Sequence, residues 1–313
     1  MAKDIETQKK FGHEEELYVP GHRACPGCGA ALACKYLTQA AGPSTIMAMP
    51  TGCMEVTSSP YPESSWGISW IHNVFENAAA VAAGVETAYK SFKKREKEGY
   101  MDYDDVNFVV LGGDGATFDI GMRSISGMFE RGHDVLYVCY DNEAYMNTGI
   151  QRSGSTPLGA STTTSPAGEE SHGEDVHKKN MPQIAAAHGV KYTAVSNVAY
   201  PEDFKSKVKK ALEIEGPKYI QVYAPCPRGW RNESEDVIEI GRKAVETAVY
   251  PMYEMEDGEI TNVKKIRDRK PVEEYLKLQG RFKHLFEQEG GEEVIQEIQR
   301  VADENAEKLG LDK

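Results

Sequence analysis

Buried strands and helices alternate along most of the chain. Short apolar runs of strand length lie at residues 44–49, 107–111, 135–140, 191–196 and 219–223. Between them, apolar or small residues recur at helical spacing in residues 21–42 (after a turn), 74–94, 117–129, 181–188 and 201–215. This alternation predicts an α/β fold, in which an open, mostly parallel sheet carries helices on both faces.

Two stretches fall outside the alternation. After Asn147 the chain is rich in Ser, Thr, Gly and Pro (TGIQRSGSTPLGASTTTSPAGEE), which predicts a polar loop whose length indicates function or mobility. Beyond about residue 232 the sequence is highly charged, with apolar residues at helical spacing. We therefore divide the chain into a main domain, residues 1–235, and a helical C-terminal extension, residues 236–313, expected to pack on a partner subunit.

Charge and apolar content exclude several classes of protein. The 36 Lys and Arg residues against 49 Asp and Glu give a net charge of −13, which makes nucleic acid and anionic membranes poor partners. The longest strongly apolar stretch, residues 78–85, is far shorter than the ~20 residues of a membrane-spanning helix. The first residues lack the apolar middle of a secretory signal, so we expect a cytoplasmic protein.

Polar and glycine residues follow two neighbouring predicted strands. Gly113, Asp114 and Gly115 come directly after one strand, and Asn142 comes directly after the next. Ligands of open parallel sheets bind at these carboxyl ends, where Asp114, Asn142 and the backbone carbonyl of Ala144 could supply the hard oxygens that Mg²⁺ requires. The glycines and the start of the following helix leave room and N–H groups for phosphates. Gly-Asp-Gly alone is an ordinary turn sequence, so the strand context carries this prediction.

The cysteines are the second group of candidate site residues. Disulfides are rare in a reducing compartment and in a chain with a large core, so metal binding explains the cysteines better. Four of the six are predicted on loops or strand ends: Cys25, Cys28, Cys53 and Cys226. Four thiolates can hold a [4Fe–4S] cluster or a zinc ion, and their spacing does not choose between the two. Burial explains Cys53 and Cys226 equally well at this point. Cys34 and Cys139 are interpreted as core residues.

Several long strings resemble one enzyme family, the β subunits of 2-oxoacid:ferredoxin oxidoreductases of the pyruvate:ferredoxin oxidoreductase type. They are CPGCG, TGCMEV, WIHNVFENAAAVAAGVE, GGDGATFDIGMRSISGMFERGHDVLYVCYDNEAYMNTGIQRS, TTTSPAG, PEDFKSKVKKALEIEGP and PCPRGW. The match spans residues 23–253. The Gly-Asp-Gly and Asn142 pattern also resembles the thiamine-diphosphate signature of decarboxylases and transketolases.

This resemblance implies a thiamine-diphosphate-binding fold for residues 1–235, with thiamine diphosphate, Mg²⁺ and a [4Fe–4S] cluster as cofactors. The implied cofactor-binding residues are Gly52, Gly113, Asp114, Gly115, Asn142, Ala144, Asn147 and Thr148, and the implied cluster ligands are Cys25, Cys28, Cys53 and Cys226. Asn147 would be catalytic, because its amide can donate a hydrogen bond to developing negative charge beside the thiazolium. The implied reaction is oxidative decarboxylation of a small 2-oxoacid, with electrons passing through the cluster to ferredoxin.

Partners follow from the same resemblance. An α subunit would supply the glutamate that activates the cofactor and an arginine for the substrate carboxylate, and a ferredoxin-like cluster subunit or domain would carry electrons onward. Activity would therefore require the partner subunit. His72 is a candidate for the cofactor pocket, although an ordinary structural histidine is also consistent with its setting. Glu76 and Glu86, on the predicted alanine-rich helix, are interpreted as packing or solvated residues.

The sequence departs from the family pattern in two places. An Arg-Val-Pro portion is absent from residues 57–70, and residues 169–180 form an acidic, histidine-containing segment that a solvated loop explains. Because the first departure lies beside the cofactor loops, the substrate could be oxalate, without coenzyme A, in place of pyruvate with coenzyme A. The alternative function is a non-redox thiamine-diphosphate decarboxylase or synthase whose cysteines bind structural zinc.

Overall fold

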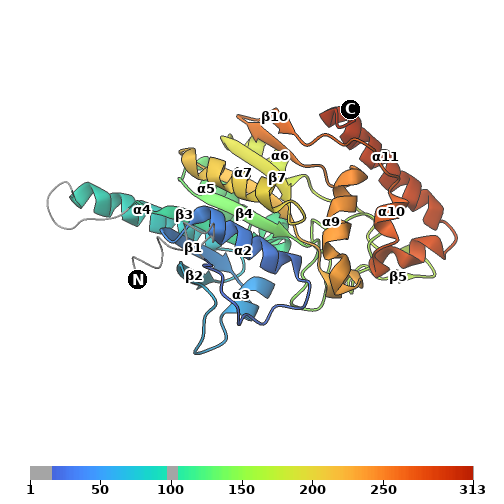
Figure 1. Ribbon diagram of the computed structural model, residues 1–313, viewed down its shortest axis with the longest axis horizontal. Coiled ribbons are helices and arrows are strands. Elements are labelled where there is room, and N and C mark those ends of the chain that lie inside the picture. The colour runs from blue at the N-terminus through green and yellow to red at the C-terminus, as the bar shows by residue number, and fades with distance from the viewer. Residues whose placement is uncertain (1–15, 97–104, 313) are drawn as a thin grey trace, which may run out of the picture.

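All five predicted apolar runs become neighbouring parallel strands of one sheet (Figure 1). The computed structural model describes residues 16–96 and 105–312. The eight strands lie in the order β10-β9-β7-β8-β4-β3-β1-β2. They are β1 (Thr45–Pro50), β2 (Ser69–Asn73), β3 (Asn107–Gly113), β4 (Leu136–Asp141), β7 (Tyr192–Asn197), β8 (Lys218–Tyr223), β9 (Tyr253–Glu256) and β10 (Glu259–Val263). The six neighbouring strands β7, β8, β4, β3, β1 and β2 pair in parallel. Strand β9 pairs antiparallel with both β7 and β10.

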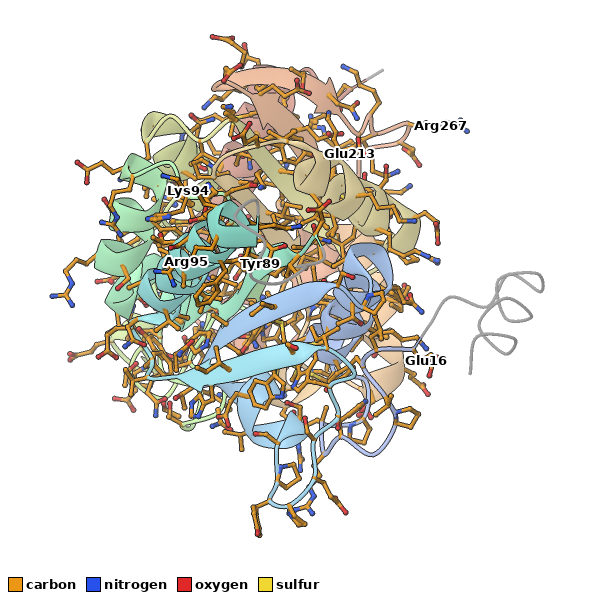
Figure 2. The ribbon with its side chains drawn as sticks, turned by 90° about the vertical axis from the view of Figure 1, so that its left-hand side faces the viewer. Glu16, Tyr89, Lys94, Arg95, Glu213 and Arg267 are labelled. Atoms are coloured by element: carbon orange, nitrogen blue, oxygen red, sulfur yellow. The ribbon has the colours of Figure 1, made fainter. Side chains whose placement is uncertain are left out.

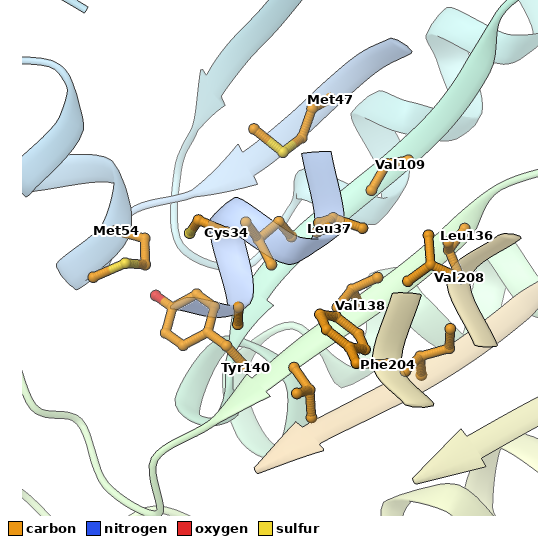
Figure 3. Close-up of a cluster of buried hydrophobic side chains, with 14 of the residues drawn as sticks. Cys34, Leu37, Met47, Met54, Val109, Leu136, Val138, Tyr140, Phe204 and Val208 are labelled. Carbon is orange, nitrogen blue, oxygen red and sulfur yellow. The ribbon is translucent and has the colours of Figure 1, made fainter. Parts of the chain in front are cut away.

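Helices cover both faces of this sheet, which confirms the predicted α/β class. The main helices are α2 (Gly29–Ala41), α4 (Ala78–Glu96), α5 (Met122–Glu130), α6 (Met181–Ala187) and α7 (Pro201–Glu213). Successive side chains of a strand point to opposite faces. Val109 of β3 therefore packs with Leu37 of α2 and Phe204 of α7 (Figure 3), and Val110 packs with Phe129 of α5 on the other face.

The alanine-rich helix α4 packs closely on the sheet because its buried face consists of small residues. Ala79 and Ala83 contact the same apolar cluster as Ala48 of β1. The last turn of α4 carries Lys93, Lys94 and Arg95, which complement the negative end of the helix dipole. Figure 1 shows this end of α4 projecting from the body of the molecule, and Figure 2 labels Lys94 and Arg95 there. No helix within the described ranges is both long and apolar enough to span a bilayer.

The C-terminal region differs from its prediction. Residues 236–313 are predicted to be helical, and this is wrong for β9 and β10, which form a hairpin that pairs with β7. The helical elements are α9 (Val237–Glu246), α10 (Glu273–Leu276), the 3₁₀ turns η2 (Ser234–Asp236) and η3 (Gly280–Phe286), and α11 (Gly291–Leu309). Of these, α9, α10, η3 and α11 share one core with Tyr223 at the end of β8 and Trp230 of α8 (Pro227–Trp230). The packing of this region on a partner subunit stays a prediction.

Candidate functional site

Four neighbouring strands end at the same edge of the sheet. Strands β1, β3, β4 and β8 are adjacent and parallel, so their carboxyl ends lie together. Cys53 begins α3 (Cys53–Ser58) after β1, Asp114 follows β3, Asn142 follows β4, and Cys226 follows β8. Residues from four distant parts of the sequence therefore meet, as expected for the ligand-binding edge of such a sheet.

One cavity of about 110 Å³ lies at this edge. It is lined by every residue that the sequence assigns to the cofactor, namely Gly52, Gly113, Asp114, Gly115, Asn142, Ala144, Asn147 and Thr148. We call it the strand-end cavity. Cys53 also lines it, together with Phe75, Tyr140, Tyr145 and Met146, which sequence reasoning missed. Phe75 and Tyr145 stack with ring centroids 5.7 Å apart, so aromatic rings form part of its wall.

Tyrosine rings lie close against two glycines of the strand-end cavity, which the sequence does not show. A Cβ atom at Gly115 would lie 2.4 Å from the ring of Tyr145, and one at Gly113 would lie 3.1 Å from the ring of Tyr140. The two tyrosines thus occupy the space that side chains at these positions would need.

The α-helix predicted from residue 117 is also corrected, because Gly115–Ile120 forms a short π-helical segment and α5 begins only at Met122.

Three oxygen atoms converge beside the cavity. Oδ1 of Asn142 lies 2.8 Å from Oδ1 of Asp114 and 2.9 Å from the carbonyl oxygen of Ala144. No hydrogen separates these acceptors, so the arrangement is unfavourable unless a cation lies between them or the Asn142 amide turns over and donates to both. Adjacent oxygens around an octahedral Mg²⁺ are about 3 Å apart, given metal–oxygen distances of about 2.1 Å. These two distances therefore fit two edges of a magnesium octahedron that meet at the Asn142 oxygen.

Asp114 is held in place by a serine from a distant loop segment. It is almost fully buried, and its Oδ2 accepts a 2.5 Å hydrogen bond from Oγ of Ser153. Burial, with the nearby charge of Asp141, raises the pKa of Asp114 well above its ordinary value. Ser153 belongs to the segment predicted to be a polar loop, and its hydroxyl is fully buried in this contact. That segment thus helps to form the site.

The structure brings the four candidate cluster ligands close to one another. Burial, followed by the nearby thiols of Cys226, Cys28 and Cys25, raises the pKa of Cys53 to about 12. Burial, with smaller effects from Cys28 and Cys25, raises the pKa of Cys226 to about 11. These thiols would therefore remain protonated at neutral pH unless a metal replaces their protons.

The segments that carry these cysteines are joined directly. The amide of Gly29 donates a 3.1 Å hydrogen bond to the carbonyl of Pro225, next to the last cysteine. Within residues 16–96 and 105–312, no three His, Cys, Asp or Glu side chains are arranged to hold a single metal ion. The two other cysteines, Cys34 and Cys139, are fully buried in the apolar core, as predicted.

The loop after β4 presents Asn147 and Thr148 at the mouth of the cavity. Both residues are exposed, and the loop is closed by hydrogen bonds between the backbones of Tyr145 and Gln151. The hydroxyl of Thr148 donates to Oε1 of Gln151 at 2.5 Å, so it serves the loop itself. Asn147 is thus placed where a bound molecule or a partner could reach its amide.

His72 lies at the rim of the site. Its Nε2 is 2.7 Å from Oγ1 of Thr51, which lines the strand-end cavity, and about half of its side chain is exposed. It belongs to β2, which the sequence predicts as part of a loop. The sequence predicts that Glu76 lies on the alanine-rich helix, and this is wrong, because Glu76 lies in the turn before α4.

Glu86 anchors α4 to the start of β4 and is not solvated. It is 1% exposed, and its carboxylate accepts hydrogen bonds from Nδ1 of His133 at 3.0 Å and from the amide of Asp134 at 3.1 Å. It also pairs with Lys90. Burial alone would raise the pKa of Glu86, but the hydrogen bonds from Lys90, His133 and Asp134 outweigh it and lower the pKa.

This lowered pKa predicts a pH-dependent contribution to stability. A carboxyl group whose pKa falls on folding stabilises the protein above its unfolded pKa, about 4.3 for Glu, and loses that effect as the pH falls through its folded pKa. Glu86→Gln is therefore expected to reduce the free energy of unfolding by about 1–3 kcal/mol at pH 7. Thermal unfolding of both proteins between pH 3 and 7 checks this. A difference between them that persists undiminished at the acid end would contradict it.

The 169–180 segment is also more ordered than a solvated loop. Strands β5 (Ala167–Gly168) and β6 (Ser171–His172) form a small hairpin. Glu174 is 3% exposed and pairs with Arg152 at 2.8 Å, and Lys178 pairs with Asp141, the last residue of β4, at 2.9 Å. A second, larger cavity of about 280 Å³ lies between this segment and α11, and it contains none of the predicted cofactor residues.

Comparison with known proteins shows the family. Residues 50–222 match the model described as thiamine pyrophosphate enzyme, C-terminal TPP binding domain. Two curated relatives named pyruvate synthase subunit PorB, from Methanosarcina barkeri and Methanocaldococcus jannaschii, are 56% and 54% identical to this chain. The alignments cover 93% and 95% of this chain and 96% and 97% of theirs. The chain belongs to the β subunits of the 2-oxoacid:ferredoxin oxidoreductase family.

Other members of this family differ in substrate. A ketoisovalerate oxidoreductase subunit VorB from Pyrococcus abyssi is 46% identical over 92% of each chain. The solved structure of 2-oxoglutarate:ferredoxin oxidoreductase from Magnetococcus marinus has a TM-score of 0.55 and 24% identity, with 72% of this chain and 77% of that chain covered, and it supports the fold. This β subunit therefore carries a thiamine-diphosphate-binding domain, and the strand-end cavity lies within the matched residues.

Proposed function

We propose that this β subunit binds thiamine diphosphate through Mg²⁺ in the strand-end cavity and passes electrons from a 2-oxoacid to a [4Fe–4S] cluster. One observation carries the proposal: Cys53, one of the four gathered cysteines, lines the same cavity as Asp114 and Asn142. Cofactor and cluster would then be immediate neighbours. When bound, thiamine diphosphate supplies the carbanion chemistry of decarboxylation, and the protein supplies orientation and a nearby electron acceptor.

The proposed Mg²⁺ ligands are Asp114, Asn142 and the carbonyl of Ala144. The Asn142 amide lies 2.8 Å from Oδ1 of Asp114 and 2.9 Å from the Ala144 carbonyl; its oxygen would face them with a divalent cation bound, and its NH₂ group can donate to both without one. Only Asp114 among them carries a charge, so the diphosphate would supply the remaining negative charge and the remaining oxygens. Ser153 keeps Asp114 oriented by its hydrogen bond to Oδ2.

The proposed cluster ligands are Cys25, Cys28, Cys53 and Cys226. A single zinc ion would bring its thiolates within about 4 Å of one another, since Zn–S bonds are about 2.3 Å long, whereas four irons hold their thiolates farther apart. Family membership favours the cluster over a single zinc ion, because these enzymes reduce ferredoxin.

The size of the strand-end cavity supports a need for a partner subunit. Pockets that enclose a ligand of cofactor size usually have volumes of about 300–1,000 Å³, and this cavity has about 110 Å³. Asn147 and Thr148 at its mouth are exposed. We infer that an α subunit covers this mouth and supplies the glutamate and arginine that the reaction needs. Ferredoxin, reached through a ferredoxin-like subunit or domain, is the proposed acceptor.

Asn147 is the proposed catalytic residue of this chain. Asn147→Ala is expected to lower kcat by about 100-fold to 1,000-fold, because a preorganised donor to developing charge contributes that much. The Kd for thiamine diphosphate should stay within a few-fold of the parent value, since Asn147 is not among the proposed metal ligands. Single-turnover kinetics and calorimetric titration of the assembled complex separate the two quantities. Weakened cofactor binding with unchanged kcat would contradict the role.

Pyruvate with coenzyme A is the proposed substrate pair, since relatives more than half identical are named pyruvate synthase subunits. The test is anaerobic viologen reduction by the complex with pyruvate or oxalate, each with and without coenzyme A. Reduction that requires both pyruvate and coenzyme A supports the proposal. Reduction with oxalate alone, independent of coenzyme A, would replace pyruvate by oxalate. Decarboxylation without any viologen reduction would instead support a non-redox enzyme.

A further inference from the structure

The residue between two proposed metal ligands, Glu143, adopts a left-handed backbone conformation that its surroundings maintain. Glu143 lies between Asn142 and Ala144 and has a φ of 66°. Residues other than glycine rarely adopt a positive φ, and they do so where neighbouring contacts determine the conformation. This φ directs the Ala144 carbonyl and the Asn142 side chain, because it sets the direction of the chain between them.

One local contact and three contacts from distant segments hold Glu143. Its amide donates to Oδ1 of Asp141 at 3.2 Å, and its carbonyl accepts from Oγ1 of Thr156 at 2.8 Å. One carboxylate oxygen accepts from Nζ of Lys178 at 2.8 Å, and the other accepts from Nη2 of Arg281 at 2.6 Å. Glu143 and Arg281 are each only 2% exposed, so water does not screen this ion pair.

Arg281 is itself fixed in orientation and contacts a second support of the same loop. Its Nε donates to Oε1 of Gln279 at 2.9 Å, and its Nη2 lies 3.2 Å from the hydroxyl of Tyr275. Its guanidinium lies 3.9 Å from the ring centre of Trp230, and the Trp230 Nε1–H donates to the carbonyl of Asn142 at 2.9 Å. A planar guanidinium can fill both roles at once, and a lysine ammonium cannot.

We propose that Arg281 is a positioning residue for the metal site: through Glu143 and Trp230 it holds Asn142 and Ala144 so that their oxygens face Asp114. This inference rests on the proposed function, because it takes these three oxygens to be the Mg²⁺ ligands. The C-terminal segment therefore belongs to the cofactor site of its own chain, in addition to any contact with a partner. A purely structural ion pair would support folding without setting metal affinity.

The test measures Mn²⁺ binding, by electron paramagnetic resonance, to the full complex stripped of metal and supplied with thiamine diphosphate. Arg281→Met is expected to raise the Kd for Mn²⁺ by about 10-fold to 100-fold, the range seen when outer supports of metal ligands are removed. Arg281→Lys keeps the charge and loses the planar guanidinium, so it should give an intermediate increase in the Kd for Mn²⁺. The matched control is Lys218→Met, which removes another buried cation, at the opposite end of β8. It should leave the Kd within twofold.

A double variant keeps the inference testable if Arg281→Met folds poorly. Glu143→Gln with Arg281→Met removes both charges of this buried pair, so no carboxylate is left facing the lost guanidinium, while Lys178 keeps its ion pair with Asp141. The double variant is expected to regain thermal stability while its Kd for Mn²⁺ stays raised at least about tenfold. Parent-like Mn²⁺ affinity in both Arg281→Lys and the double variant would overturn the positioning role. A parent complex that binds no Mn²⁺ would refute the proposed metal site itself, and this inference with it.

Discussion

Replacing Asp114 with asparagine is expected to lower 2-oxoacid-dependent viologen reduction by about a thousandfold. Asp114 supplies the one carboxylate among the three converging oxygens, so Asp114→Asn removes the charge that attracts Mg²⁺ while it preserves size. A loss of ~4 kcal/mol of metal-dependent stabilisation corresponds to about three orders of magnitude in rate. The measurement is kcat/KM of the reconstituted complex during a Mg²⁺ titration, with thiamine-diphosphate binding followed by calorimetry.

The matched control is Asp134→Asn, which changes another aspartate near the amino end of β4, away from the strand-end cavity. Asp134 accepts a hydrogen bond from Lys218 at 2.5 Å, and an asparagine oxygen can accept it as well. Activity and cofactor affinity of this control should match those of the parent protein. Retention of tight cofactor binding and turnover in Asp114→Asn would show that Mg²⁺ is bound elsewhere.

Replacing Cys226 with alanine is expected to abolish electron transfer altogether. A [4Fe–4S] cluster needs four ligands, and Cys226 is the one that comes from beyond β8. Its thiol is largely buried near those of Cys28 and Cys25, so its removal would leave the proposed cluster with three cysteine ligands. Iron content of the isolated chain should fall to background, and viologen reduction with pyruvate should fall below detection.

Cys34→Ala is the control for the cysteine prediction. Cys34 is fully buried in the core beside Leu37 and is not a proposed ligand (Figure 3). Its replacement should leave the iron content unchanged and cost only the small loss of packing expected for a cysteine-to-alanine change. Loss of iron in Cys34→Ala together with its retention in Cys226→Ala would contradict the proposed ligand set.

Much of the fold is predictable from the sequence because its signals are local. Strands β3 and β4 are nearly continuous apolar runs, since both of their faces are buried, and each of the five central strands is bounded by a helix pattern. Strand β2 was not predicted because most of its side chains are exposed and its sequence is aromatic and polar. The β9–β10 hairpin was missed because its charged residues at the sheet edge resemble those of a solvated helix.

The residues of the site also divide into those that local sequence signals predict and those that they do not. Asp114 and Asn142 could be found because each directly follows a buried run, and the sheet order then brings them together. Ser153, Phe75 and Arg281 could not be found, because their contacts with the site join segments far apart in the chain. The sequence offers one indication of Tyr145, which is its position three residues after Asn142. Only the structure shows that its ring fills the space beside Gly115.

The most direct test of the account is freeze-quench electron paramagnetic resonance of the anaerobic complex mixed with pyruvate and coenzyme A, without ferredoxin. The account predicts the signal of a reduced [4Fe–4S] cluster in the parent complex and its absence in both Asp114→Asn and Cys226→Ala. Stoichiometric zinc without iron in this chain would contradict the account. A cluster that dithionite reduces but the 2-oxoacid does not would contradict it equally.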